Sequence, residues 1–270
     1  MGGALTLPPS TPRIVKKLLY SLIDKAFDVG VVPELNRERA QLGLKTIEHL
    51  LPHLQDSADL YVTLFPEWFT ATKPDYPKPL INGDFVLGTP SQEPISSELA
   101  EFLTAGQPPV IFTASTANVP VNKFFEIAAD VVDKLNTRAI FVTSDRNNVP
   151  VNLPKSVLWQ EYVPFNRVLP EASAIVHYGG IGTLAEACKA GVPQLILPFS
   201  YDQFDNASIV RDLGIGKSIF LRLVTKGSLL KQLSELLRSQ DIRKNCTNVS
   251  ANFRSGLATK QIVDRVLAAI

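Results

Sequence analysis

Short apolar runs alternate with helical patterns over the second half of the chain. The apolar runs occupy residues 110–116, 138–144, 156–161, 174–178 and 194–198. An amphipathic helix is predicted at 121–135, and further helices are predicted at 182–190 and 203–213. Strands that alternate with helices of this length form a parallel sheet covered by helices on both faces. The sequence therefore predicts an α/β fold with a Rossmann-like parallel sheet, in which ligands bind outside the carboxyl ends of the strands.

A cluster of glycines follows the strand predicted at 174–178, in the stretch "VHYGGIGTLAEACKAG" that begins at residue 176. Glycine has no Cβ, so a ligand can approach its main chain closely. The backbone N–H groups from Gly180 to Thr183 lie at or just before the start of the next helix, where N–H groups are unpaired and the helix dipole is positive. This arrangement predicts an anion site with phosphate as the natural ligand. A tight strand-to-helix turn is the simpler alternative.

Two other glycine motifs match this stretch less well. A P-loop requires a lysine at a fixed spacing after its glycines, and none is present. A dinucleotide-binding fingerprint requires a third glycine where Ala185 stands, and an acidic residue at the end of the next strand, where "LILPFS" has none. An NAD-dependent oxidoreductase is therefore a weak alternative.

Charge and cysteine content exclude several partners. The 27 basic and 26 acidic side chains give a net charge of +1, and their even distribution offers no basic stripe for nucleic acid. Cys188 and Cys246 are too far apart in sequence to suggest a disulfide framework or a metal site, so we expect no metal and a reducing compartment. Because neither a signal peptide nor a long apolar run is predicted, we expect a cytoplasmic protein.

The first 87 residues are less regular. They contain helical patterns at 14–28 and 34–51, a short strand from Leu60, and a proline-rich passage that we expect to be loop. Four prolines around a brief helical patch in residues 88–109 are typical of an inter-domain connection. The predicted organisation is an N-terminal portion at 1–87, a linker at 88–107 and the sheet domain at 108–270.

The helix predicted at 14–28 is amphipathic. Ile14, Leu18 and Leu22 share one side, and Lys16 and Lys25 belong to the other. We expect this helix to pack against protein, with peripheral membrane contact as the alternative.

His49 and His53 are four residues apart, a spacing that can bind a metal on a helix. Pro52 is expected to disrupt that helix, and no acidic residue follows at the spacing of zinc proteases. We therefore interpret both histidines as structural.

Residues 108–220 resemble the C-terminal domain of GT-B-type, UDP-glycosyltransferase-like enzymes, which include sterol, macrolide and plant natural-product glycosyltransferases. The resemblance rests on "YVPFNRVLPEASAIVHYGGIGTLAEACKAGVPQLILPFSYDQFDNA", which begins at residue 162 and is similar to the family's donor-binding motif almost without gaps. It implies a UDP- or dTDP-sugar donor, hexose transfer to a hydroxyl acceptor that can be lipophilic, and no cofactor.

The resemblance also implies a role for individual residues. Gly180, Gly182 and Thr183 would hold the donor pyrophosphate, and Glu186 would accept hydrogen bonds from the ribose hydroxyls. The simpler interpretation of Glu186 is an acid near the helix N-terminus that is favourable to the helix dipole. The complete predicted donor site is Tyr162, His177, Tyr178, Gly179, Gly180, Gly182, Thr183, Glu186, Asp202 and Gln203.

The remaining roles concern the sugar and the base. Asp202 and Gln203 would hold the sugar hydroxyls, and Tyr162 would lie against the pyrimidine ring, although a half-buried core tyrosine is the simpler interpretation. The sequence departs from the family motif in three places. Tyr178 replaces the histidine that usually reaches the phosphates, Tyr162 replaces a tryptophan, and Phe165 stands where glutamine is common, so the nucleobase is not identified.

A further departure concerns catalysis. Members of this family begin with an acceptor-binding domain whose first loop supplies a histidine as general base, and this chain resembles only the end of that domain, at "NRERAQLGL" and "LFPEWF". We expect the general base to be absent from this chain. Two functions remain open. The first is the donor-binding portion of a glycosyltransferase whose acceptor half lies on a partner polypeptide or has been lost from this reading frame, and the second is a non-catalytic nucleotide-sugar binding module.

Overall fold

The computed structural model describes residues 11–73, 76–88, 94–113, 122–254 and 259–269. The chain forms two compact units. The first, the sheet unit, consists mainly of Phe85–Leu257 with Trp68–Thr70. The second, the helical unit, is built from Leu5–Glu67, Ala71–Asp84 and Ala258–Ile270.

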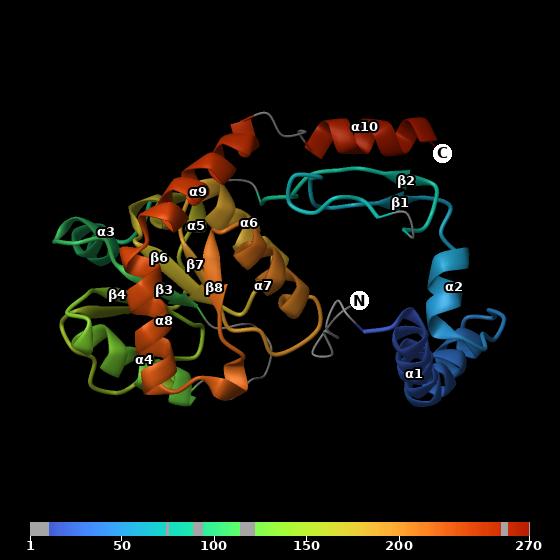
Figure 1. The fold of residues 1–270 in the computed structure, drawn as a ribbon, viewed down its shortest axis with the longest axis horizontal. Coiled ribbons are helices and arrows are strands. Elements are labelled where there is room, and N and C mark those ends of the chain that lie inside the picture. The colour runs from blue at the N-terminus through green and yellow to red at the C-terminus, as the bar shows by residue number, and fades with distance from the viewer. Residues whose placement is uncertain (1–10, 74–75, 89–93, 114–121, 255–258, 270) are drawn as a thin grey trace. The chain divides into compact units, whose positions relative to one another are not determined.

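The sheet unit contains a six-stranded sheet in which every pair of neighbouring strands is parallel (Figure 1). Its order is β5-β4-β3-β6-β7-β8. The strands are β3 (Val110–Thr113), β4 (Ala139–Val142), β5 (Val157–Gln160), β6 (Ala174–His177), β7 (Gln194–Ile196) and β8 (Gly216–Ser218). The chain starts in the middle with β3, builds outward to β5, and returns to β6 on the other side of β3. This is the strand order of a doubly wound nucleotide-binding fold, so the predicted fold class is confirmed.

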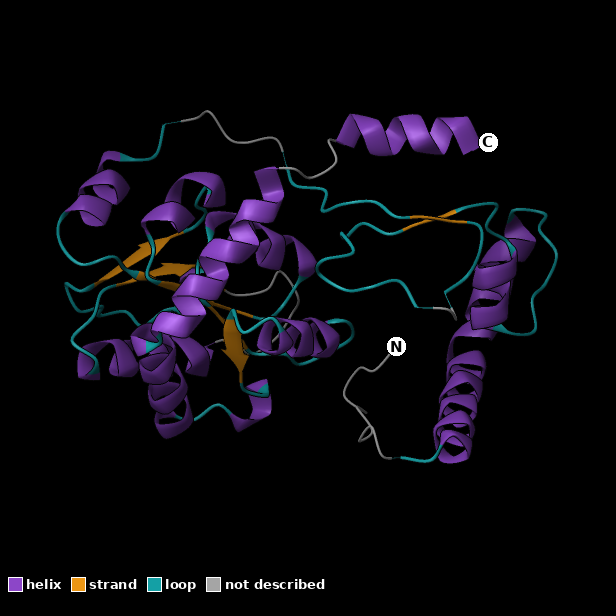
Figure 2. Ribbon diagram, turned by 45° about the horizontal axis from the view of Figure 1, so that its top comes forward, coloured by secondary structure: helices purple, strands orange, loops and turns teal. Residues whose placement is uncertain are grey.

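Helices cover both faces of the sheet (Figure 2). On one face, α4 (Asn122–Lys134) and α8 (Lys226–Arg238) bury Phe125, Leu229 and Leu233 against β3, β4 and β6. On the other face, Leu169 and Ala187 pack against Ile111 and Ile175. That layer includes α5 (Phe165–Val168) and α6 (Ile181–Ala190), and α9 (Gln240–Ala251) packs on α6. The helix α7 (Gln203–Asp212) packs beside β8.

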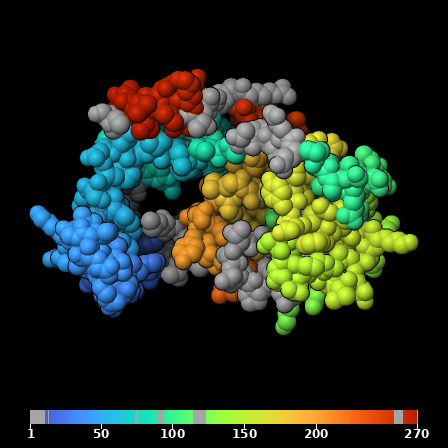
Figure 3. Space-filling model, turned by 180° about the vertical axis from the view of Figure 1, so that it is seen from behind, coloured from blue at the N-terminus to red at the C-terminus, as the bar shows by residue number. Residues whose placement is uncertain are grey.

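Part of the predicted linker belongs to the sheet unit. Residues Ser97–Thr104 form α3, capped by the Ser96 hydroxyl, which accepts a hydrogen bond from the N–H of Leu99. Leu99 is 2% exposed and packs in the core beside Ile111. Gln160 of β5 also donates a hydrogen bond to Glu98, and Figure 3 shows this turquoise segment against the yellow-green part of the surface. These contacts make α3 part of the domain core.

The strand β8 was not predicted. It is a three-residue strand at the edge of the sheet, Gly216–Ser218, and its sequence Gly-Lys-Ser contains no apolar run that could mark a strand. Gly216 is required there, since an added Cβ would lie 2.2 Å from the backbone oxygen of Gln194 and 2.6 Å from a methyl group of Val210. The strand is therefore specified by close backbone approach, which a hydrophobicity pattern does not detect.

The first helix of the helical unit differs from the prediction. A single helix, α1 (Arg13–Gln41), replaces the helices predicted at 14–28 and 34–51, and it continues through Pro33. The helix ends at Gln41, and Gly43, two residues farther on, has a φ of 67°. The N–H of Gly43 bonds the oxygen of Ala40 and the N–H of Leu44 bonds that of Arg39, the two hydrogen bonds of a Schellman motif. The prediction of helix up to residue 51 was wrong because this glycine signal was missed.

The expected disruption by Pro52 was also wrong. The helix α2 (Leu50–Asp56) runs through Pro52, which is its third residue. The N–H groups of the first turn have no intrahelical acceptor, so a proline costs little there. His49 Nδ1 lies 2.8 Å from Asp28 Oδ2, and His53 Nε2 lies 3.3 Å from Arg39 Nη1. Both histidines therefore tie α1 to the segment that contains α2.

The rest of the helical unit is small. Two strands, β1 (Tyr61–Val62) and β2 (Leu80–Ile81), pair in parallel, and α10 (Thr259–Ala269) contacts this region through Arg265, which donates to the oxygen of Asn82. The apolar side of α1 is exposed at Ile14, Leu18 and Leu22. No helix among the described residues is both long and apolar enough to cross a membrane.

Candidate functional site

The predicted donor site lies at the carboxyl end of β6, where the chain, having added strands on one side of β3, begins to add them on the other. The strands β3 and β6 are neighbours in the sheet but are separated in sequence by β4 and β5. In such sheets a crevice forms outside the carboxyl ends of these two strands. The glycine turn follows β6 directly, so the fold puts it at this crevice. Residues 114–121, which follow β3, lie outside the described residues.

Gly179 gives the turn its shape. Its φ is 89°, and an added Cβ would lie 2.7 Å from Ile196 Cγ2 and 3.3 Å from the backbone oxygen of Gln203. Only glycine is compatible with both constraints. The chain then enters α6 with Gly180 as the N-cap residue, and no side chain caps the helix. The first N–H groups of α6 therefore have neither an intrahelical acceptor nor a capping side chain.

Gly180 and Gly182 face open space. An added Cβ at either position would meet no atom of the described residues within 4 Å. Together with Thr183, which is partly exposed, they form a surface of backbone N–H groups at the positive end of a helix. This surface is suited to an anion such as a phosphate. The predicted arrangement of these residues at a helix N-terminus is confirmed.

His177 stabilises the glycine turn through a buried hydrogen bond. Its Nδ1 accepts a hydrogen bond of 3.1 Å from the N–H of Gly179, so its Nε2 carries the proton and donates to Gln194 Oε1 at 3.0 Å. The amide of Gln194 in turn donates to the sulfur of Cys188 at 3.3 Å. His177 is 2% exposed, and burial lowers its pKa to about 4, although the bond to Gln194 acts in the opposite direction. The neutral ring therefore holds the glycine turn in place rather than facing a ligand.

Tyr178 points to the other face of the sheet. It is 3% exposed, and its ring lies 5.9 Å from that of Phe124 and 5.4 Å from that of Phe199. Burial raises the pKa of its hydroxyl. Among the described residues this hydroxyl has no hydrogen-bond partner. Tyr178 is therefore a core residue, and neither its ring nor its hydroxyl reaches the surface of the described structure.

The loop after β7 is fastened to the glycine turn by Asn206. Its amide donates to the backbone oxygen of Gly179 at 2.8 Å and to Asp202 Oδ2 at 3.0 Å. Gln203 Oε1 accepts hydrogen bonds from the N–H groups of Phe199 and Ser200, at 3.0 and 3.3 Å. Asp202 is exposed beside this framework. The structure thus brings Asp202 and Gln203 next to the glycine turn.

Glu186 lies on the second turn of α6. Burial raises the pKa of its carboxyl group, and Lys189 acts in the opposite direction. Lys189 acts through its charge alone, and no described side chain forms a hydrogen bond with Glu186. A half-buried carboxylate without a partner, close to an anion site, is available to accept hydrogen bonds from ligand hydroxyls.

Tyr162 is the predicted residue that lies farthest from the others. It follows β5, which is separated from β6 by β4 and β3, a distance of about 14 Å at the usual strand spacing. Its side chain is 71% exposed, so it is not a core tyrosine. A ligand that touches both Tyr162 and the glycine turn must therefore lie along the carboxyl edge of the sheet.

Sequence reasoning missed two residues of the site, Gln194 and Asn206. Both are buried amides, a rare and costly placement unless every polar atom is paired. Gln194, an amide inside an otherwise apolar strand, was the available signal. No group of three or more metal-ligating side chains comes together in the part of the chain that the structure describes.

A family model described as "Erythromycin biosynthesis protein CIII-like, C-terminal domain" matches residues 126–269, more than half of the chain. The glycosyltransferase GtfC of Amycolatopsis orientalis is 25% identical over 267 residues, which cover 95% of this chain. The chain spans less than two thirds of the length of the curated relatives that it matches, 63% in the case of GtfC.

Solved structures show the same fold. The glycotransferase of kitacinnamycin is similar with a TM-score of 0.75 and 19% identity, over 96% of this chain and 67% of that one. The glycosyltransferase VinC, solved in complex with dTDP, is similar with a TM-score of 0.61 and 22% identity, over 76% of this chain and 50% of that one.

Proposed function

Because the chain belongs to the erythromycin biosynthesis protein CIII-like family of GT-B glycosyltransferases, we propose that it binds a nucleoside-diphosphate sugar as the donor for transfer of a hexose to an acceptor hydroxyl. One observation carries the proposal: α6 begins without a side-chain cap at the carboxyl edge of the sheet, and Gly180 and Gly182 leave the space in front of it open. The dinucleotide-dependent oxidoreductase has no support from the family relationship.

The donor would lie along the carboxyl edge of the sheet. Its pyrophosphate would bind the N–H groups of Gly180, Gly182 and Thr183. Glu186, which lies four residues after Gly182 in α6, would accept hydrogen bonds from the ribose. VinC, which has the same fold, was solved with dTDP, and this supports a pyrimidine nucleoside diphosphate as ligand.

The two ends of the donor would reach different loops. The sugar hydroxyls would contact Asp202 and Gln203, which Asn206 and the backbone of Phe199 hold beside the glycine turn. The base would lie on the exposed ring of Tyr162. In this arrangement the chain's own groups stabilise the charge of the departing pyrophosphate, which is the electrostatic part of glycosyl transfer.

The donor site is tested by a substitution that fills the open space. Gly182→Val should abolish binding of UDP and dTDP without unfolding the protein, since valine costs no more than glycine in a helix and its Cβ meets no atom among the residues that the structure describes. Gly227→Val is the matched control, because Gly227 is also the second residue of a helix, α8, and is unobstructed. Calorimetry that finds unchanged nucleotide affinity in Gly182→Val, or no binding by the wild-type protein, would overturn the proposal.

Transfer also requires a general base for the acceptor proton. Of the three histidines in the chain, His177 is buried in the turn, and His49 and His53 belong to the helical unit. We propose that the base is supplied from outside these residues, by an acceptor-binding half. The chain alone should then bind UDP but form no glycoside, and a chain joined to such a half should form one.

Product analysis by mass spectrometry separates the two functions that remain. Sugar transfer only after an acceptor half is supplied supports the glycosyltransferase, and donor binding without transfer in both forms supports a non-catalytic binding module. Robust transfer by the chain alone would contradict the proposed absence of a base. His49 would then be the first residue to substitute, because Asp28 forms a hydrogen bond with its ring. A carboxylate in this position orients a histidine that acts as a general base.

A further inference from the structure

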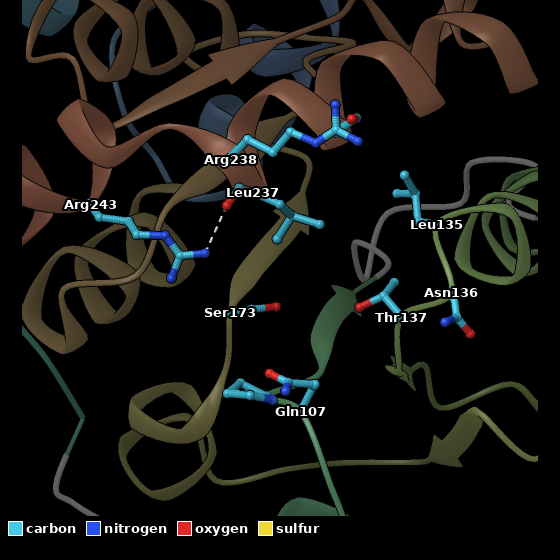
Figure 4. Close-up of a pocket in the computed structure, with 10 residues that line it drawn as sticks. Gln107, Leu135, Asn136, Thr137, Ser173, Leu237, Arg238 and Arg243 are labelled. Carbon is cyan, nitrogen blue, oxygen red and sulfur yellow. Dashed lines mark hydrogen bonds between the residues drawn. The ribbon is translucent and has the colours of Figure 1, made fainter.

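A pocket lies at the amino ends of the strands of the sheet (Figure 4), whereas the glycine turn follows the carboxyl end of β6. Gln107, Thr137 and Ser173 each precede a strand of the sheet, namely β3, β4 and β6, and they form one wall. The end of α8 and the first turn of α9 form the other. The pocket has a volume of about 350 Å³.

The charge of this pocket is one-sided. Arg238 and Arg243 line it, and none of its lining residues is acidic. The guanidinium of Arg243 is held by a hydrogen bond of 2.8 Å to the backbone oxygen of Leu237, which leaves its other N–H groups available. Arg238 has no hydrogen-bond or ion-pair partner among the described residues. Two guanidinium groups without a carboxylate to neutralise them are the usual means of binding a phosphate.

Ser173 provides an independent indication of a ligand. Its hydroxyl oxygen is buried, yet it has no hydrogen-bond partner among the described residues. Its backbone N–H already bonds the oxygen of Pro109, so the side chain is the group left unsatisfied. Figure 4 shows the Ser173 side chain directed into the pocket, across from Thr137. A buried hydroxyl of this kind costs free energy unless a partner occupies the space in front of it.

We propose that this pocket is a second anion site that binds the phosphate group of a small phosphorylated ligand. Arg238 and Arg243 would provide the charge, and the Ser173 hydroxyl would donate to a phosphate oxygen. The volume exceeds that of one phosphate group and lies at the lower end of the range for small-molecule sites, which leaves room for a sugar-sized substituent. The site is separate from the donor site, and it does not depend on the function proposed for the glycine turn.

Titration of the full chain with inorganic phosphate and with ribose 5-phosphate tests the site, at constant ionic strength and with saturating UDP to fill the donor site. Both probes should bind, and ribose without phosphate should not. Tighter binding of ribose 5-phosphate than of phosphate identifies a phosphate ester as the ligand, and equal binding identifies free phosphate. The double variant R238Q/R243Q should weaken binding at least about tenfold, the loss expected from charged hydrogen bonds.

Lys244→Gln is the control. Lys244 is next to Arg243 in the sequence but does not line the pocket, so this variant removes a nearby positive charge from outside the site. It should leave phosphate affinity unchanged. Ser173→Ala should weaken phosphate binding and, at the same time, raise the melting temperature of the unliganded protein, since it removes the unsatisfied hydroxyl. The proposal is overturned if phosphate does not bind at tens of millimolar, or if Lys244→Gln weakens binding as much as the double variant. A loss of UDP binding alone would affect only the donor site.

Discussion

His177 and Gln194 form a buried hydrogen bond of 3.0 Å between the neighbouring strands β6 and β7. The other ring nitrogen of His177 accepts the N–H of Gly179, the residue whose backbone turns the chain toward α6. The geometry of the anion site is therefore linked to the sheet core through one neutral imidazole. A residue with no access to a ligand can in this way control how a ligand binds.

Two substitutions separate the two hydrogen bonds of His177. In His177→Asn the side-chain oxygen can still accept the N–H of Gly179, whereas in His177→Gln the amide reaches Gln194 and leaves that N–H unpaired. Each variant should lose about 1–3 kcal/mol of the free energy of unfolding in urea, the usual cost of an unsatisfied buried group. Titration with UDP should show that His177→Asn retains more affinity than His177→Gln.

Cys188→Ala is the control for this comparison, because it removes only the far end of the network, the bond from Gln194 to sulfur. It should leave UDP affinity near that of the wild type. Equal UDP affinity in His177→Gln and His177→Asn would show that the bond to Gly179 does not shape the site.

The stability of the protein should fall in mildly acidic solution because of His177. Burial lowers its pKa in the folded state to about 4, whereas an unfolded histidine titrates near 6.5. Between these values the unfolded chain binds a proton that the folded chain does not, so the free energy of unfolding falls as the pH falls through this window, by up to about 3 kcal/mol. Above the unfolded pKa this contribution is constant. Urea denaturation across the window should give a shallower pH dependence for His177→Asn, and identical slopes would refute the assignment.

The affinity for UDP should also depend on the ionisation of Glu186. Burial raises its pKa, so its carboxyl group becomes protonated at a higher pH than an exposed glutamate, and it then loses capacity to accept hydrogen bonds from the ribose. Calorimetry should show UDP affinity falling as the pH falls through this raised pKa, and Glu186→Gln should remove the dependence. The loss in Glu186→Gln should be larger for UDP than for dTDP, which lacks the 2′-hydroxyl. An equal loss for both would place the ribose elsewhere.

The sheet and the glycine turn could be predicted because their signals are local in sequence. Apolar runs mark β3, β4 and β6, and the helix periodicity of 121–135 corresponds to α4 at Asn122–Lys134. A strand-to-helix turn is predicted from the local sequence alone, by Gly179, Gly180 and Gly182. The strand order then follows from the rules for parallel sheets.

The remaining features depend on contacts between distant residues. Asn206 bonds the oxygen of Gly179, a residue 27 positions earlier, and Gln194 bonds His177, 17 positions earlier. No periodicity or local motif encodes such pairs. The end of α1 is a different case, because a local feature predicts it. Gly43 favours termination of the helix, although the apolar pattern continues beyond it. The anion pocket at the amino ends of the strands combines residues from 107 to 243 and has no sequence motif.

Asp202 should distinguish the sugar from the nucleotide. It is exposed at the start of α7, and Asn206 holds one of its oxygens at 3.0 Å, so the other oxygen is available to a donor hydroxyl. Asp202→Asn keeps an oxygen for Asn206 but removes the charge that strengthens a bond to the sugar. Its affinity for UDP should therefore be unchanged, while its affinity for UDP-glucose should fall about tenfold. Asp212→Asn, at the far end of α7, removes the same charge and should alter neither affinity. If UDP and UDP-glucose lose affinity equally in Asp202→Asn, the residue supports the loop and does not contact the sugar.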